Sequence, residues 1–182
     1  GNSTGFEIIL NDPLLKNYNN AKYFQSKAVF LLMHCFINNL TGDINKAYKY
    51  GKQCLELVGE SPENKYIAVY EYLLILQEMM TISHYLGKYG ESQLYFENLY
   101  EEENKLLKYT PKKVRNFLVM RTLTCKINLN SSLGRFEDNL PVILTLLKYY
   151  DENSKDSYRD EIIVTDFLVA ATYFSIGRYD DS

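Results

Sequence analysis

Histidine and cysteine are the side chains in this sequence whose types could support metal binding or nucleophilic catalysis. The histidines are His34 and His84, and the cysteines are Cys35, Cys54 and Cys125. None of the five has a second donor at the short spacing that a zinc site requires. The odd number of cysteines and their wide separation also argue against a disulfide framework. We therefore interpret the cysteines as small buried residues and the histidines as packing or groove residues.

Paired carboxylates, which could act as general acid and base, occur in YEEENK at 100–105 and YRDE at 158–161. They stand beside Lys and Arg at helix ends, which is typical of a solvated face. The sequence contains no GxSxG, HExxH, Walker or GxGxxG pattern. We therefore predict a chain that is not an enzyme and that uses no cofactor and no metal. An enzyme built from helix pairs is a weaker hypothesis, and it would require carboxylates that converge in a pocket.

Charge and hydropathy narrow the classes of partner. The 182 residues carry a formal net charge of -3, without the basic excess that nucleic-acid binding needs. The basic stretch KLLKYTPKKVR at 105–115 is a minor candidate for phosphate binding, although cations also favour helix C-termini. The apolar run AVFLLMHCF at 28–36 is too short to span a bilayer. Free thiols favour a cytoplasmic location, and a removed targeting segment ahead of residue 1 stays open.

The elements that position these residues are marked by three copies of one phrase: YLGKYGES at 85–92, SLGRFEDN at 132–139 and SIGRYDDS at 175–182. A looser copy, LTGDINKA, places Gly42 ahead of Gly87, Gly134 and Gly177. The glycines recur about every 45 residues, a period typical of helical repeats. Because glycine reaches positive φ without steric cost, it can end a helix. Each phrase is therefore predicted to be a turn between two helices.

Proline marks the opposite ends of the predicted helices. Asp12, Ser61 and Thr110 each precede a proline, which is the pattern of an N-cap followed by the first helical residue. The apolar spacing then predicts helices over about 62–86 and 111–133. Pro141 lies inside a helical pattern and is expected to kink that helix or delay its start. No alternating run is long enough for a strand, so the predicted class is all-α.

This pattern resembles the tetratricopeptide repeat, in which a glycine near the end of helix A is followed by an aromatic residue two positions on, a small residue five positions on and a large apolar residue nine positions on. The corresponding positions here are Ile44, Ala47, Gly51 and Cys54 after Gly42; Tyr89, Ser92, Phe96 and Leu99 after Gly87; Phe136, Asn139, Ile143 and Leu146 after Gly134; and Tyr179 and Ser182 after Gly177. The period exceeds the standard unit of about 34 residues, and tryptophan is absent. The chain is therefore most similar to the long-helix relatives in bacterial regulators and sensor proteins, with HEAT-like pairs second.

The resemblance covers about residues 28–182 and implies a right-handed superhelix of antiparallel helix pairs, a TPR-like α-α solenoid. It places an N-terminal segment with a short helix at 1–27 and repeats at about 28–60, 61–109, 110–153 and, incompletely, 154–182. If the groove positions of the family carry over, two A helices supply a polar, partner-binding groove. Its residues would be Gln77, Thr81, His84 and Tyr85, then Arg121, Thr124, Asn128 and Ser131.

The resemblance thus implies a non-catalytic scaffold that binds a protein or peptide. The alternative is the ligand- or peptide-sensing region of a bacterial transcriptional regulator or signalling protein whose output domain lies outside this chain. We also expect the apolar residues Phe167, Ala170, Ala171 and Phe174 to be covered, either by continuing chain or by another subunit. A homo-oligomer formed through the incomplete C-terminal repeat is one form of that expectation.

Overall fold

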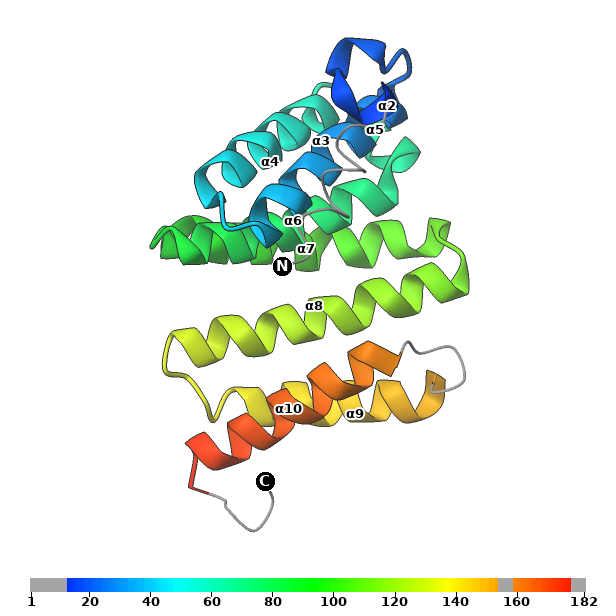
Figure 1. Cartoon of the computed structure of the whole chain (residues 1–182). Coiled ribbons are helices and arrows are strands. Elements are labelled where there is room, and N and C mark those ends of the chain that lie inside the picture. Colours follow the sequence, from blue (N-terminus) through cyan, green and yellow to red (C-terminus); the bar gives the residue numbers. More distant parts are fainter. Residues whose placement is uncertain (1–12, 154–158, 178–182) are drawn as a thin grey trace. The chain divides into compact units, whose positions relative to one another are not determined.

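The computed structural model describes residues 13–153 and 159–177, and every regular element within these ranges is a helix (Figure 1). The predicted all-α class is therefore confirmed for the described residues. The helices are α2 (Pro13–Lys16), η1 (Tyr18–Asn20), α3 (Phe24–Leu40), α4 (Ile44–Gly59), α5 (Pro62–Ile67), α6 (Val69–Tyr85), α7 (Tyr89–Leu106), η2 (Leu107–Tyr109), α8 (Lys112–Ser132), α9 (Asn139–Asn153) and α10 (Arg159–Ser175).

The chain forms two compact units, Gly1–Tyr109 and Thr110–Ser182, called unit 1 and unit 2 below. Unit 1 contains two helix pairs, α3 with α4 and α6 with α7. Helix α6 is the centre of this unit because it contacts α3, α4 and α7 and has most of its residues buried. Its largest fully buried side chains are Leu73, Ile75, Leu76, Met79 and Ile82. Their burial supplies the main hydrophobic stabilisation of unit 1.

Close packing inside unit 1 depends on Gly51 of α4. A Cβ atom at this position would lie 2.1 Å from Sδ of Met79 and 3.4 Å from Sγ of Cys35. The absence of a side chain on Gly51 therefore lets α4 approach α6 and α3 closely.

Unit 2 contains the pair α8 with α9, and α10 contacts both of these helices. Its buried core is formed by Met120, Ile127, Val142, Ile143 and Leu146. Leu168 and Val169 of α10 are partly buried against this core. In each unit a third helix contacts both helices of a pair: α6 contacts α3 and α4 in unit 1, and α10 contacts α8 and α9 in unit 2.

The predicted turns between two helices are confirmed at Gly42, Gly87 and Gly134. At Gly177 the helix end is confirmed, whereas the helix predicted after it lies outside the described residues. Gly42, Gly87, Gly134 and Gly177 follow the ends of α3, α6, α8 and α10 and have φ of 86°, 71°, 71° and 76°. At the end of α6, the Lys88 N–H donates to the Ser83 carbonyl over 2.8 Å and the Gly87 N–H donates to the His84 carbonyl over 2.9 Å. This is the Schellman arrangement, which satisfies carbonyls that the helix leaves unpaired.

Two of the positions after Gly42, Gly87 and Gly134 are buried in every case. The residues five positions on, Ala47, Ser92 and Asn139, are fully buried. Ser92 Oγ donates to the Met80 carbonyl over 2.8 Å, and Asn139 Nδ2 donates to Ser131 Oγ over 2.8 Å. The residue five positions after each of these three glycines is therefore packed against the helix before it. The residues twelve positions on are also fully buried, and these are Cys54, Leu99 and Leu146.

Two predicted helix boundaries differ from the structure. The helix predicted over 62–86 is broken at Ala68, whose φ of -118° and ψ of 47° leave the helical region, so α5 and α6 are separate helices. Ser61 caps α5 as predicted, because its Oγ accepts from the Glu63 N–H over 3.2 Å. Thr110 is not the N-cap of α8, since Pro111 with ψ of 147° occupies that position.

The remaining proline signals have simple outcomes. Pro141 lies in the first turn of α9, where its missing N–H costs no helical hydrogen bond, and α9 begins only at Asn139. Pro13 begins α2, as predicted. The prediction for Asp12 lies outside the described residues, as do those for Tyr179 and Ser182.

Candidate functional site

The groove residues predicted on α6 have different degrees of exposure. Tyr85 is 65% exposed, and Thr81 and His84 are half-buried. Gln77 is fully buried, so the prediction that it faces an open groove is wrong for this residue. The reason is the central position of α6, on which α3, α4 and α7 pack. The hydroxyl of Thr81 donates to the Gln77 carbonyl over 3.2 Å.

The groove residues predicted on α8 belong to unit 2. Asn128 is exposed, whereas Arg121, Thr124 and Ser131 are half-buried. Ser131 Oγ accepts a hydrogen bond from Asn139, so it helps to hold the turn that follows α8. Because the two sets of residues lie in different units, a single groove that contains both of them stays a prediction.

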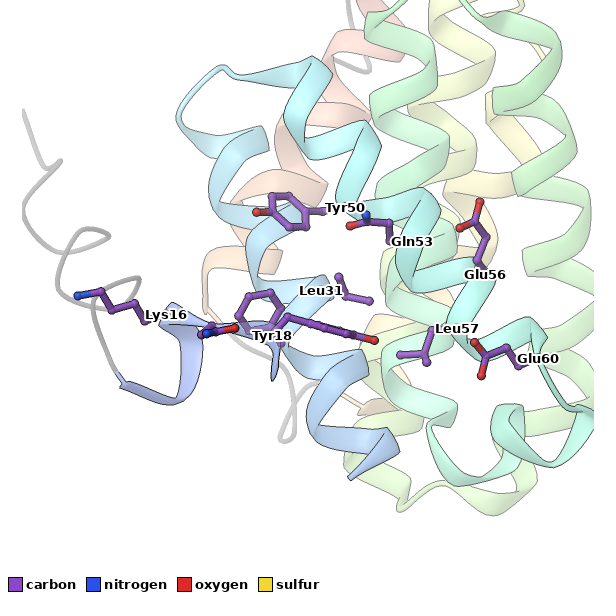
Figure 2. A pocket seen from close by; sticks show the side chains of 10 residues that line it. Lys16, Tyr18, Leu31, Tyr50, Gln53, Glu56, Leu57 and Glu60 are labelled. Carbon is purple, nitrogen blue, oxygen red and sulfur yellow. The ribbon is translucent and has the colours of Figure 1, made fainter. Parts of the chain in front are cut away.

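A cavity in unit 1 was not predicted from the sequence (Figure 2). Its volume is about 510 Å³, within the usual range for ligand pockets. We call it the α4 pocket, and it is lined by Lys16, Asn17 and Tyr18, by Phe30 and Leu31 of α3, and by Tyr50, Gln53, Glu56, Leu57 and Glu60. Tyr50, Gln53, Leu57 and the C-cap Glu60 are three or four residues apart, and Glu56 precedes Leu57, so the five line one side of the C-terminal half of α4.

Aromatic rings form one wall of the α4 pocket. The ring centroids of Tyr18 and Phe30 are 5.6 Å apart with an interplanar angle of 71°. The His34 ring lies between Phe30 and Tyr50, with centroids at 4.3 Å and 4.8 Å. His34 therefore packs between two aromatic side chains of the wall, which agrees with the packing role that was one of the two predicted for it.

The carboxylates of Glu56 and Glu60 form the acidic side of the α4 pocket. Among the described residues, neither makes a hydrogen bond or an ion pair. The last turn of α4 contains no basic residue. Cations usually favour a helix C-terminus because the helix dipole is negative there, and this end carries two acids instead.

The hydroxyl of Tyr18 faces this acidic side. Figure 2 shows it directed towards Leu57 and Glu60, while the Lys16 amine is directed away from them. Burial raises the pKa of Tyr18, and the nearby negative charge of Glu60 raises that pKa further. Tyr18 is therefore a neutral hydroxyl at physiological pH. A cationic group already lies near its ring, since Lys27 Nζ is 5.4 Å from the Tyr18 centroid.

The cysteines are buried, as predicted. Burial raises the pKa of the Cys54 thiol to about 12, and it also raises the pKa of Cys35. Both thiols are therefore protonated at neutral pH, and the thiolate is the nucleophilic form. Within the described residues, no three His, Cys, Asp or Glu side chains converge as a metal site would require.

Two buried acids of α6 were missed by the sequence analysis. Asn39 Nδ2 donates to Glu78 Oε2 over 3.0 Å, and Gln25 Nε2 approaches Glu71 Oε1 at 3.4 Å. Both amides belong to α3, so they connect α3 to α6 at two points along the pair. Buried carboxylates need such donors, which gives Glu78 a structural explanation. For Glu71 the explanation is partial, because its Oε2 is buried without a hydrogen-bond partner.

Unit 2 contains a shallower hollow of about 460 Å³ between the α8–α9 turn and the end of α10. It is lined by residues 134–138, Ser175 and Ile176. On α10, Phe167 and Phe174 are 71% and 64% exposed, while Ala170 and Ala171 are half-buried. The expectation that another segment or subunit covers this face stays a prediction.

Comparison of the chain with known protein families, curated proteins and solved structures gave no match. Of the helices that the structure describes, none combines the length and the apolar character needed to cross a bilayer.

Proposed function

We propose that this chain is a non-catalytic scaffold of TPR-like helix pairs that binds a protein or peptide partner. The observation that carries the proposal is the recurrence of one turn at Gly42, Gly87, Gly134 and Gly177, each with positive φ. The fully buried fifth residues after the first three glycines add support. Four matching turns favour repeated units, which a solenoid would stack into a right-handed superhelix.

Helix-pair repeats present an extended surface rather than an enclosed active site, and this favours recognition of a peptide or a helix. Exposed polar and aromatic residues at the predicted groove positions provide the chemistry. Tyr85 offers an aromatic surface, and Asn128 offers an amide that can pair with a peptide backbone. Both are exposed, so they contribute little to the folding of their units.

The proposal is tested with the double variant Tyr85→Ala/Asn128→Ala. We expect the melting temperature to change by no more than a few degrees, because both side chains are exposed. Capture of partners from a lysate of the source cells should be lost, as measured by affinity purification and mass spectrometry. Tyr23→Ala is the control, since Tyr23 is 77% exposed and lies outside the predicted groove. An unchanged set of captured partners in the double variant contradicts the groove.

The ligand-sensing alternative makes a different prediction. If the chain reports on a small ligand, a metabolite extract should raise its melting temperature by mass action, because a bound ligand stabilises only the folded state. The α4 pocket is the observation that favours this alternative, since its volume suits a small molecule. A peptide partner found by capture, with no response to metabolites, favours the scaffold.

A further inference from the structure

The α4 pocket combines three features that each favour a positive charge, namely aromatic rings, two carboxylates and the C-terminal end of a helix. Aromatic rings line it through Tyr18, Phe30 and Tyr50. Two carboxylates, Glu56 and Glu60, lack ion-pair partners among the described residues. Electron-rich ring faces attract ammonium and guanidinium groups, and unpaired carboxylates attract them over a longer range.

The helix end strengthens the negative potential of the pocket. Helix α4 has sixteen residues, and Glu56 lies in its last turn while Glu60 is its C-cap. The helix dipole places partial negative charge at this end, where α4 has no basic side chain in its last turn. Asn64 Nδ2 donates to the Leu57 carbonyl over 3.2 Å and so satisfies one of the carbonyls at this helix end, but it does not contact either carboxylate.

Two lysines, Lys16 and Lys27, lie near the α4 pocket. Lys16 is the one cation among the lining residues, and Figure 2 shows its amine directed away from Glu60. Lys27 lies over the Tyr18 ring at 5.4 Å, which shows that this ring accepts an ammonium group. In the part of the chain that the structure describes, neither Glu56 nor Glu60 has a cation within ion-pair distance.

We propose that the α4 pocket binds the guanidinium or ammonium group of an arginine or lysine side chain on the partner peptide. This inference rests on the proposed function, because it assigns a peptide residue to a pocket of the scaffold. The cation would lie between the rings and the carboxylates of Glu56 and Glu60, and the Tyr18 hydroxyl could accept one of its N–H groups. Peptide specificity would then require a basic residue, while other contacts could come from the rest of the scaffold.

The test uses the full chain and two capped pentapeptides, Ala-Ala-Arg-Ala-Ala and the same peptide with citrulline in place of arginine. Citrulline keeps the shape of arginine and removes its charge. In an NMR titration at low salt, the arginine peptide should shift the amide signals of α4 and bind about five- to tenfold more tightly than the citrulline peptide. Equal affinity for the two peptides overturns the inference.

The variant Glu56→Gln/Glu60→Gln should weaken binding of the arginine peptide by about five- to tenfold. It should remain folded, because it removes two negative charges from the negative end of a helix. The matched control is Glu97→Gln/Glu101→Gln, which has the same spacing and charge change on α7 and should bind as the unmodified chain does. Tight binding retained in the pocket variant overturns the inference.

A measurement on the unmodified chain gives an independent check. Raising the salt concentration should weaken binding of the arginine peptide, because salt screens exposed charges. Any binding of the uncharged citrulline peptide should stay unchanged. Free agmatine, which carries the guanidinium group without a peptide, tests whether the pocket binds a small molecule instead. If agmatine binds and the arginine peptide does not, the inference that a peptide side chain occupies the pocket is wrong. If the two peptides bind the pocket equally but Tyr85→Ala/Asn128→Ala abolishes capture of partners, the proposed function stands and this inference alone is wrong.

Discussion

The hydroxyl of Tyr48 on α4 donates to Oε2 of Glu91 on α7 over 2.6 Å, and this bond joins two successive helix pairs of unit 1. Lys52 and Lys88 lie 3.6 Å and 3.7 Å from the same carboxylate. Lys88 Nζ also lies 3.9 Å from the centroid of the Tyr48 ring. The hydrogen bond from Tyr48 holds the pKa of Glu91 below its usual value, and the two lysines lower that pKa further.

The stabilising effect of Glu91 should therefore depend on pH. Because its folded pKa is lowered, Glu91 stabilises the fold above the ordinary glutamate pKa of about 4.3 and loses this effect as pH falls through the folded value. Glu91→Gln should lower the free energy of unfolding at pH 7 by less than about 1 kcal/mol, since the side chain is 38% exposed.

Urea unfolding at several pH values measures this prediction. The difference between the unmodified chain and Glu91→Gln should shrink as pH is lowered from 7 towards 3. Glu97→Gln is the control, because Glu97 has no cationic partner within the described residues and accepts only from Gln93 at 3.1 Å. If the difference in free energy of unfolding stays constant over this pH range, the ionised Glu91 carboxylate does not stabilise the fold.

The second prediction concerns the turn after α8. Gly134 has φ of 71°, and a Cβ there would meet no atom within 4 Å, so any cost of alanine must come from the backbone. Gly134→Ala should lower the free energy of unfolding by about 1–2 kcal/mol. Chemical denaturation measures this, with Gly90→Ala as the control, since Gly90 lies in the first turn of α7 with open space around it and no positive φ. No loss of stability in Gly134→Ala would refute the left-handed turn.

The third prediction concerns the close approach of α4 to α6. Alanine at an exposed helical glycine usually gains about 1 kcal/mol, but at Gly51 its Cβ would collide with Met79. We expect Gly51→Ala to lower the free energy of unfolding by a net of about 1–2 kcal/mol, because overpacking a tight core costs more than the helical gain. The double variant Gly51→Ala/Met79→Val should recover part of this loss. An increase in stability of the single variant would show that Met79 can move aside at little cost.

The fourth prediction concerns the buried small residue after Gly87. Ser92 is fully buried, whereas its neighbour Gln93 is exposed on the same helix. Ser92→Leu should lower the melting temperature strongly, because the larger side chain has no room and the hydrogen bond to Met80 is lost. Gln93→Leu is the matched control and should change the melting temperature little. Equal effects from the two variants would argue against a packing role for the fifth residue.

The helix ends were predictable where a residue has a local backbone role. Glycine at 42, 87, 134 and 177 reaches a φ that other residues avoid, and Ser61 can satisfy the free N–H of Glu63. These effects act over a few residues and need no tertiary information. The break at Ala68 has no such signal, since neither glycine nor proline lies next to it. Packing around α6 therefore decides where that helix begins.

The α4 pocket shows a similar division. The acidic helix end is visible in the sequence, because Glu56 and Glu60 lie at the end of α4 and its last turn has no basic residue. This departs from the usual preference for cations at a helix C-terminus and is the signal that predicts an acidic site there. That Tyr18 and Phe30 lie opposite these acids is a long-range relationship between η1, α3 and α4. No periodicity along one helix reports on that distance.

The sequence by itself thus determined the all-α class, the glycine turns and the buried positions that follow them, because sterics and helical periodicity are local. Only the tertiary structure decided which polar residues of a helix are open to a partner. Gln77 and Tyr85 lie on the same helix and both fit the predicted groove pattern, yet one is fully buried and the other is 65% exposed. This difference in exposure arises because other helices pack on one part of α6 and not on the other. The spacing of residues along α6 does not show which of them a distant segment of the chain will cover.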